Sequence, residues 1–406
     1  MTRQIHRTMS VLAFALLASF LTAPPSRAAD AVAPAATKTI AVSSPSFAFS
    51  PGNWTGDNGR IGDTFRQTWT SGAYFRVTWQ SALKPQTAKL LLDTSQYGDT
   101  VKTRPTITYC IDSKWVADVP SADSIDITVP AHGDTHVLTV YLQNSAQSER
   151  WGKPGESGHN VLRVTGLQVD SAATLLPAAR SSKWILEVGD SITEGIGTSG
   201  NLDDYSYFIG QAMRTRGYEY CVSACGWSGW LQYGDRPKDV LPYYFVSGSS
   251  NGEGGKYDPA QSRWDKIDGN NHSVLDSKGH ISGWGGTDQE PAMILINYGT
   301  NDAFFDANPS DLRASITQAL SALRKAAPSA KIYLIVPFEQ FSAEPVKAAF
   351  AKYKAANAQD NDTILIDLGN EPALSLRTGG FYGDIHPNMR GHAVFATQLL
   401  AAILGK

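Results

Sequence analysis

The chain has 406 residues, 42% of them hydrophobic and 18% charged, and its formal net charge is −3. This length exceeds one typical domain, and the apolar fraction is sufficient for a packed core, which excludes an intrinsically disordered chain. Mild acidity without a basic run excludes a typical nucleic-acid-binding protein.

The first 28 residues are typical of an export signal. Arg3 and Arg7 precede the apolar stretch Val11 to Leu21, and Ser26-Arg27-Ala28 is a small-x-small cleavage sequence. The apolar stretch is shorter than the roughly 20 residues of a membrane-spanning helix, so we expect removal of residues 1–28 rather than a retained anchor. The sequence thus predicts a secreted or periplasmic protein with no membrane span after signal removal.

The cysteines do not indicate a disulfide framework or a metal site. The chain has only Cys110, Cys221 and Cys225, and no Cys/His spacing resembles a zinc site. We expect these residues to be small buried thiols.

Residues 37–174 are predicted to form an all-β sandwich of the jelly-roll kind. Short runs of β-forming residues are separated there by Gly, Pro, Asp and Ser, and no helix-period segment interrupts them. The runs are Tyr74–Trp79, Lys89–Leu92, Ile107–Ile111 and His136–Leu142.

Residues 183–406 are predicted to form a three-layer α/β/α domain with a parallel sheet. Short apolar runs, as in strands covered on both faces, alternate there with helical patterns. The strands are expected at Trp184–Val188, Tyr218–Val222, Met293–Tyr298, Lys331–Val336 and Thr363–Asp367, and helices at Asp311–Ala326 (capped by Ser310), Glu344–Ala356 and Arg390–Leu404. The long segment 247–290, with Tyr257, Trp264 and Trp284, is expected to be an ordered loop beside the active site.

Chemistry is expected beyond the carboxyl ends of these strands, where α/β domains bind ligands. The sequence Gly189-Asp190-Ser191-Ile192-Thr193-Glu194-Gly195 follows the first strand. A serine there can stand on a tight turn with its hydroxyl exposed, beside a following helix N-terminus that stabilises negative charge. The same sequence also fits an ordinary helix cap.

Three further segments end at the same predicted edge. Tyr298-Gly299-Thr300-Asn301-Asp302 can aim the Asn301 amide at an oxyanion, or form a plain turn. Cys225-Gly226-Trp227-Ser228-Gly229-Trp230 can present a glycine N–H without side-chain obstruction. Gly383-Asp384-Ile385-His386-Pro387 places a histidine in a loop that the proline restrains.

These four segments, in this order, resemble the four sequence blocks of the SGNH (GDSL) hydrolases, from about Lys183 to the C-terminus. The resemblance implies a serine esterase without metal or organic cofactor. It assigns Ser191 as nucleophile and first oxyanion donor, His386 as general base, and Gly229 and Asn301 as the other oxyanion donors. Gly226 is the alternative to Gly229.

The third catalytic residue departs from the family pattern. The family usually has an Asp three residues before the His, where this chain has Gly383, and Asp384 stands one residue later. The Gly-Asp-x-His-Pro sequence and the preceding sandwich are similar to carbohydrate esterase family two, in which a backbone carbonyl orients the histidine in some members. Either a Ser-His-Asp triad with Asp384 or a Ser-His dyad oriented by the Gly383 carbonyl is therefore implied.

The substrate implied by this resemblance is an O-acetylated polysaccharide or oligosaccharide. Trp227, Trp230 and Tyr298 are the candidate substrate-binding residues, although packing alone also accounts for most aromatic residues. The alternatives are a lysophospholipase or aryl esterase of the same fold, and a catalytically inactive carbohydrate-binding protein. The sequence leaves open the glycan, the role of the sandwich and the oligomeric state.

Overall fold

The computed structural model describes residues 36–56, 64–82, 86–97, 104–145, 160–232, 290–369, 379–381 and 385–405. The predicted export signal, 1–28, and the aromatic residues expected in the 247–290 loop lie outside the described residues. Along the described part, no helix combines the length and the apolar character that a bilayer crossing requires.

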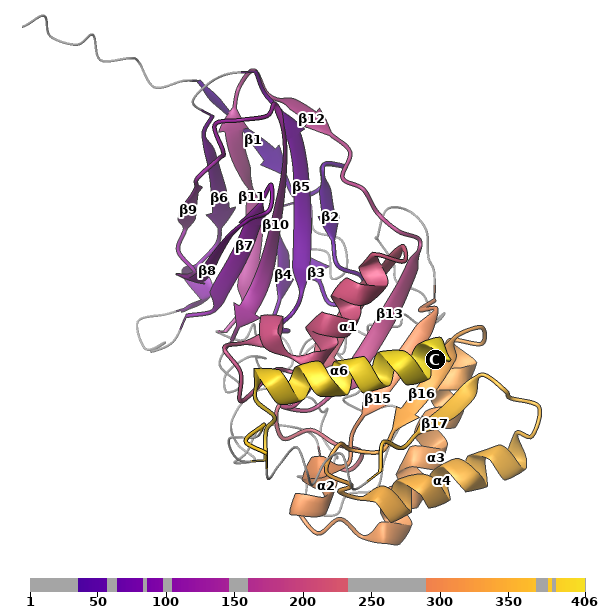
Figure 1. Ribbon diagram of the computed structural model, residues 1–406. Helices are drawn as coiled ribbons and strands as arrows, with labels where there is room; N and C mark the ends of the chain where they lie inside the picture. The colour runs from indigo at the N-terminus through magenta and orange to yellow at the C-terminus, as the bar shows by residue number, and fades with distance from the viewer. Residues whose placement is uncertain are drawn as a thin grey trace, which may run out of the picture. The chain divides into compact units, whose positions relative to one another are not determined.

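The N-terminal half contains two antiparallel sheets, shown in indigo and magenta in Figure 1. The first has the order β3-β4-β11-β6-β9, with β1 also paired to β11. Its strands are β1 (Thr37–Ala41), β3 (Thr55–Gly56), β4 (Arg66–Thr68), β6 (Ala88–Leu92), β9 (Ser124–Ile127) and β11 (Leu162–Asp170).

The second sheet has the order β12-β5-β10-β7-β8, with β2 also paired to β5. Its strands are β2 (Phe47–Phe49), β5 (Tyr74–Gln80), β7 (Thr106–Ile111), β8 (Lys114–Pro120), β10 (Thr135–Asn144) and β12 (Thr174–Leu176), and a short 3-10 helix, η1 (Ser95–Tyr97), follows β6.

One apolar core joins these two sheets. Side chains alternate along the strands, so that in β6 Ala88, Leu90 and Leu92 are buried while the residues between them are partly exposed. They pack with the inward residues of β5 and β10, among them Trp79 and Leu138. The predicted sandwich is confirmed.

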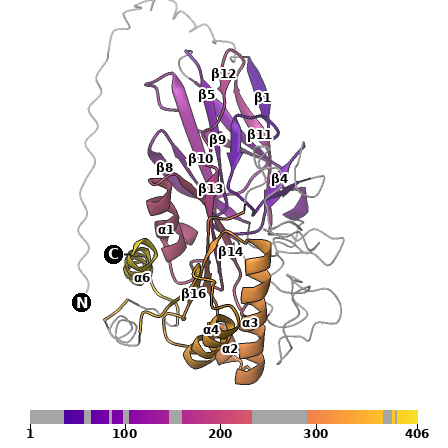
Figure 2. The same cartoon turned by 90° about the vertical axis from the view of Figure 1, so that its right-hand side faces the viewer.

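The C-terminal half contains one parallel sheet of order β14-β13-β15-β16-β17. Its strands are β13 (Lys183–Gly189), β14 (Tyr218–Ala224), β15 (Met293–Asn297), β16 (Lys331–Ile335) and β17 (Thr363–Ile366). Helices α1 (Tyr205–Arg214) and α6 (Met389–Leu404) cover one face, and α3 (Pro309–Ala326) and α4 (Ala343–Ala356) cover the other. Figure 2 shows the sheet between these layers, so the α/β/α prediction is confirmed.

Two local expectations were wrong. The cap of α3 is Asn308, whose side chain accepts from Ser310 N–H and Asp311 N–H, with Pro309 at the first helical position. Ser310 lies inside the helix because Pro309 has already fixed the helical φ one residue earlier. Furthermore, no helix begins directly after Ser191: residues 191–199 form turns, and α1 starts only at Tyr205.

The sandwich contacts the α/β half through hydrogen bonds and packing. The Asn53 side chain donates to the Val222 carbonyl at 3.2 Å, and the Tyr74 hydroxyl donates to Glu219 at 2.5 Å. Gln143 of β10 donates to the Ser199 carbonyl at 3.0 Å. Since each contact reaches β14 or the turns after β13, the sandwich supports the segments that carry the predicted chemistry. The predicted domain boundaries, 37–174 and 183–406, stay a prediction.

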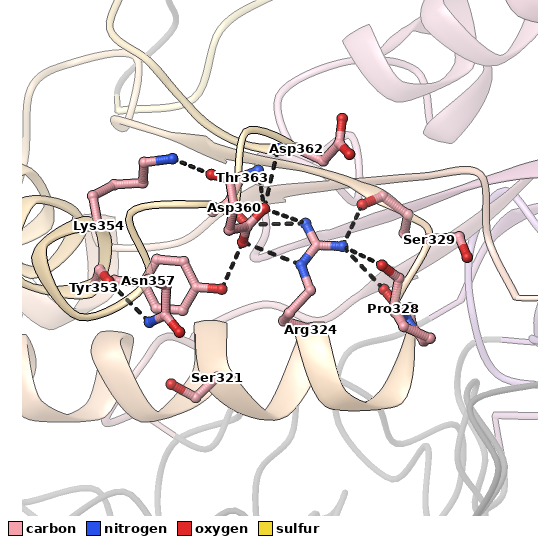
Figure 3. Close-up of polar contacts among 12 residues, drawn as sticks. Ser321, Arg324, Pro328, Ser329, Tyr353, Lys354, Asn357, Asp360, Asp362 and Thr363 are labelled. Atoms are coloured by element: carbon pink, nitrogen blue, oxygen red, sulfur yellow. Dashed lines mark hydrogen bonds and ion pairs between the residues drawn. The ribbon is translucent and has the colours of Figure 1, made fainter.

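A polar cluster around Asp360 joins helices α3 and α4 to the start of β17 (Figure 3). Asp360, before β17, accepts from Arg324 of α3 at 3.1 Å and from the Tyr353 hydroxyl of α4 at 2.7 Å. Thr363 donates to the same carboxylate at 2.5 Å. Partial burial raises the pKa of Asp360, but the hydrogen bonds from Thr363, Tyr353 and Arg324 outweigh it, so this pKa lies well below its usual value.

We predict that Asp360→Asn lowers the free energy of unfolding by about 1–3 kcal/mol at pH 7, because several donors lose an ionised acceptor. A depressed carboxyl pKa stabilises the fold above the unfolded-state pKa, about 3.9, and this contribution is lost as the pH falls below it. Urea unfolding at pH 7 and pH 3.5 measures this effect. The difference in free energy of unfolding between the wild type and Asp360→Asn should be smaller at pH 3.5.

The matched control is Asp362→Asn, since the Asp362 side chain points away from the cluster in Figure 3. A difference in unfolding free energy that does not change with pH, or an equal loss of stability in Asp362→Asn, would contradict this account of the cluster.

Candidate active site

The parallel register of the sheet brings three of the predicted segments together. Gly189, the last residue of β13, pairs with Ala224 of β14 on one side and Asn297 of β15 on the other. The residues that follow these three strands therefore leave the sheet at the same edge. Ser191, the Cys225–Trp230 segment and Asn301 start from neighbouring points.

Ser191 and His386 form a hydrogen-bonded pair at this edge. His386 Nε2 lies 2.9 Å from Ser191 Oγ, within the range in which a base can take a proton from a nucleophile. Both residues are partly buried, so the pair is reachable from solvent. The His386 loop leads into α6, whose N-cap, Asn388, accepts from Arg390 N–H and Gly391 N–H and so fixes the start of the helix.

Gly197, which the sequence analysis missed, lies against the histidine. It has φ +96, and a Cβ there would lie 2.8 Å from the His386 Cβ and 3.0 Å from the Pro387 carbonyl oxygen. Only glycine fits both the conformation and the space. The closely spaced glycines after Ser191, at 195, 197 and 200, were the signal that could have indicated this close approach.

Asn301 lies in the first turn of the short helix α2 (Thr300–Phe304) and is buried. Its Nδ2 donates to the Ser228 carbonyl at 2.9 Å, which ties α2 to the segment after β14. An amide nitrogen carries two hydrogens, so this bond leaves Asn301 one donor for a ligand.

Gly229 is engaged in contacts with two neighbouring residues, and its proposed part in the oxyanion hole stays a prediction. Its N–H donates to the Gln232 carbonyl at 2.8 Å, so in this structure it is not free for an oxyanion. A Cβ at Gly229 would lie 2.4 Å from Asp302 Oδ2. Asp302 accepts from Trp230 N–H at 2.9 Å and Leu231 N–H at 2.8 Å, and the glycine permits this close contact.

The alternative glycine is also engaged. Gly226 N–H donates to Glu194 Oε2 at 3.0 Å, which joins this segment to the turns after Ser191. Ser191 N–H, in contrast, makes no hydrogen bond within the described part of the chain. Ser191 N–H and Asn301 Nδ2 are thus the two predicted oxyanion donors that the structure leaves available.

The three aromatic candidates differ in exposure. Trp230 and Tyr298 are 4% and 1% exposed and pack edge to face, with Trp230 Nε1 donating to the Tyr298 carbonyl at 3.1 Å. The structure therefore places them in the core, because neither ring has a free face for a substrate. Trp227 is 44% exposed, has φ +64 and contacts Phe305, which follows α2.

Buried carboxyl groups lie beneath this edge. The pKa of Asp190 is raised to about 7, because burial and the charge of Asp302 outweigh the hydrogen bond from Ile192 N–H, which lowers it. Burial also raises the pKa of Asp302 to about 6, although two backbone N–H groups lower it. Like charges held this close in a dry environment ionise reluctantly.

The residues predicted to orient the histidine, Gly383 and Asp384, lie outside the described residues. The choice between triad and dyad therefore stays a prediction. Cys221 and Cys225 are buried, as expected, whereas Cys110 is partly exposed.

Comparison with known proteins places this geometry in a family. Residues 188–394 match the model of the GDSL-like lipase/acylhydrolase family. The chain belongs to the GDSL-like lipase/acylhydrolase family. It is thus an ester hydrolase by family, and the predicted resemblance is confirmed. No curated protein matches the sequence.

Solved structures share the fold of this acylhydrolase over both halves. An acetyl xylan esterase from Butyrivibrio proteoclasticus aligns with a TM-score of 0.60 and 16% identity, covering 91% of this chain and 99% of its own. A family two carbohydrate esterase from Cellvibrio japonicus aligns at 0.57 and 16%, with coverages of 91% and 99%. Another from Clostridium thermocellum, in complex with cellohexaose, aligns at 0.55 and 13%, with coverages of 88% and 98%.

We predict a specific pH dependence from Asp190. A carboxyl pKa raised by folding makes the folded state bind more protons than the unfolded state, so stability falls as the pH rises between about 4 and 7. Asp190→Asn cannot ionise, so its stability relative to the wild type should improve by roughly 1–4 kcal/mol between pH 5 and pH 8.

Urea unfolding at both pH values measures this difference, with the exposed Asp306→Asn as control. Equal pH slopes of the free energy of unfolding for the wild type and Asp190→Asn would contradict the raised pKa of Asp190.

Proposed function

We propose that this acylhydrolase removes O-acetyl groups from carbohydrate through an acyl-enzyme on Ser191. The observation that carries the proposal is the 2.9 Å hydrogen bond between His386 Nε2 and Ser191 Oγ at the carboxyl edge of the sheet. A nucleophile and base in direct contact are the minimal machinery of covalent acyl transfer.

The mechanism follows from this pair. His386 takes the Ser191 hydroxyl proton as Oγ bonds to the ester carbonyl carbon, and the tetrahedral intermediate carries the negative charge on the carbonyl oxygen. His386 then gives the proton to the departing sugar hydroxyl, which leaves acetyl-Ser191. Water, deprotonated by His386, attacks that ester, and the Ser191 oxygen leaves with the proton, releasing acetate.

The oxyanion is held by Ser191 N–H and the second hydrogen of Asn301 Nδ2. Both donors are fixed before substrate arrives, because Ser191 lies in hydrogen-bonded turns and Asn301 is held by the Ser228 carbonyl. Preorganised donors are worth more than flexible ones, since no reorganisation is needed in the transition state. A third donation, from Gly229 as predicted or from Gly226, requires that N–H to leave its present acceptor.

The substrate class rests on Trp227. Its side chain is 44% exposed, and the next residue, Ser228, accepts the hydrogen bond from the proposed oxyanion donor Asn301. A flat apolar ring suits the apolar face of a sugar. The fold shared with carbohydrate esterases supports the same substrate.

The proposal also covers the location of the protein and the group that orients His386. We infer that residues 1–28 direct export, consistent with a polymeric substrate outside the cell. Asp384, or the Gly383 carbonyl, then holds His386 in the productive tautomer.

Removal of the central pair should abolish turnover. We predict that Ser191→Ala and His386→Ala each lower kcat by at least about 10⁴-fold, and that Asn301→Ala lowers it by about 10²–10³-fold through loss of one oxyanion donor. Acetate release from acetylated xylo-oligosaccharides measures this. Labelling of the wild type by a fluorophosphonate, absent in Ser191→Ala, shows the nucleophile directly.

A wild-type protein that neither labels nor releases acetate would overturn the proposal in favour of an inactive carbohydrate-binding protein. Faster hydrolysis of octanoyl than of acetyl nitrophenyl esters would indicate a lysophospholipase or aryl esterase instead.

Trp227 should act on substrate binding. We predict that Trp227→Ala raises KM for acetylated xylo-oligosaccharides by about 10-fold, since loss of a stacking ring costs about 1.4 kcal/mol, and leaves kcat/KM for ethyl acetate within about 2-fold. The control is Trp115→Ala, an exposed tryptophan of the sandwich strand β8. Equal losses on both substrates would show that Trp227 supports the structure of the site rather than the sugar.

A further inference from the structure

A cavity lies at the opposite end of the parallel sheet from Ser191. It measures about 430 Å³ and is bordered by the sandwich strand β5, the connector after β12, helix α1 and the start of β14. Strand β14 begins here at Tyr218 and reaches the candidate active site only after Ala224. The cavity is therefore separate from the candidate active site.

The side chains that line the cavity carry an excess of positive charge. Arg76, Arg180 and Arg214 contribute three guanidinium groups, and Glu219 is the one carboxylate among the lining residues. Both oxygens of Glu219 are already engaged: Oε1 accepts from Arg76 at 2.5 Å, and Oε2 accepts from the Tyr74 hydroxyl at 2.5 Å. Glu219 is therefore paired directly with Arg76, and its charge also acts on Arg180 and Arg214, so three guanidinium groups share one carboxylate.

Arg180 and Arg214 are held by neutral groups. Arg180 donates to the Phe47 carbonyl, and Arg214 donates to the Tyr141 hydroxyl at 3.3 Å while lying 5.5 Å from the Tyr74 ring centre. Partial desolvation lowers the pKa of Arg180 and the positive charge of Arg76 lowers it further, while the nearby charge of Glu219 raises it. Each guanidinium has five N–H donors, so both keep donors for a further acceptor.

The geometry points to an anion-binding site in this cavity, formed by Arg76, Arg180 and Arg214, for a phosphate, sulfate or carboxylate group. Partly buried charges are normally paired, and guanidinium forks match oxyanions with two hydrogen bonds each. The three arginines come from β5, the connector and α1, so one bound oxyanion would link the sandwich to the α/β half.

The test measures thermal unfolding and calorimetric binding on the full chain at constant ionic strength set with NaCl. Sodium sulfate and sodium phosphate should raise the Tm progressively with concentration, as a ligand that binds only the folded state must. In Arg180→Ala the Kd for sulfate should weaken by about 10-fold or more, through the loss of charge-assisted hydrogen bonds. Arg180→Lys keeps the charge but lacks the planar fork, so its Kd for sulfate should lie between those of the wild type and Arg180→Ala.

The control for charge alone is Lys352→Ala, an exposed lysine on α4 that should bind sulfate like the wild type. The proposal is overturned if sulfate acts no differently from chloride, or if Lys352→Ala loses as much affinity as Arg180→Ala. Should Arg180→Ala not fold, Arg180→Lys decides by the same comparison.

The affinity for methyl glucuronide, compared with that for sulfate and phosphate, distinguishes between the possible sources of the anion. Tighter binding of this sugar than of sulfate and phosphate assigns the cavity to the carboxylate of an acidic sugar. Tighter binding of the two inorganic ions assigns it to a free dianion.

Discussion

The register of β13 between β14 and β15 is the constraint on which the site depends. Gly189 is paired with Ala224 and Asn297, and all three strands run in the same direction. A shift of any one strand by one residue would turn its side chains to the other face and move the residues beyond it. The backbone hydrogen bonds of the sheet, made far from solvent, thus set the starting points of the segments that carry Ser191, Trp227 and Asn301.

Short polar contacts then fix these segments to one another. Asn301 holds the Ser228 carbonyl, Asp302 holds Trp230 N–H and Leu231 N–H, and Glu194 holds Gly226 N–H. Each of these hydrogen bonds joins residues that follow two different strands, so a displacement of one segment would break a bond to another. Such mutual restraint is what preorganised catalysis requires, because a displacement of about 1 Å can cost 10²-fold in rate.

The buried carboxyl groups in the α/β half lower the free energy of unfolding. Both carboxyl oxygens of Glu187 in the middle of β13 are buried without a hydrogen-bond partner among the described residues, and burial raises the pKa of Glu187 well above its usual value. An unsatisfied buried polar group costs about 1–3 kcal/mol. The large apolar clusters on both faces of the sheet offset that cost, and polar groups of this kind are concentrated at functional sites rather than in ordinary cores.

Much of the fold was predictable because its strands have strong local patterns. The apolar runs at 184–188, 293–298 and 331–336 are typical of strands covered on both faces, and the roles of Ser191 and His386 were implied by the resemblance of the segments that carry them to the SGNH hydrolases. Side-chain direction was not predictable in the same way. Trp230 and Trp227 are three residues apart in one segment, yet one is buried and one exposed, because burial depends on what packs against the segment.

The same limit applies to glycine. Gly229 is predicted to present an unobstructed N–H, and the structure shows a further need for glycine there, because a Cβ would collide with the Asp302 carboxylate. The sequence shows only that a side chain is missing; which neighbour needs the space is a property of the folded chain. Ser310 was mistaken for a cap for a related reason, since Asn308 and Pro309 together outcompete it locally.

The sandwich has a structural part in the site that no local pattern indicates. Gln143 of β10 accepts from the Thr108 hydroxyl at 2.6 Å and donates to Asp118 at 2.7 Å, so its amide is held rigidly within the sandwich. The same amide donates to the Ser199 carbonyl, in the turn that carries Gly197 against His386. One line of contacts therefore runs from the second sheet of the sandwich to the proposed base. The sandwich is thus part of the framework that positions His386, and it also covers backbone groups along the edge strand β14, where Asn53 donates to the Val222 carbonyl.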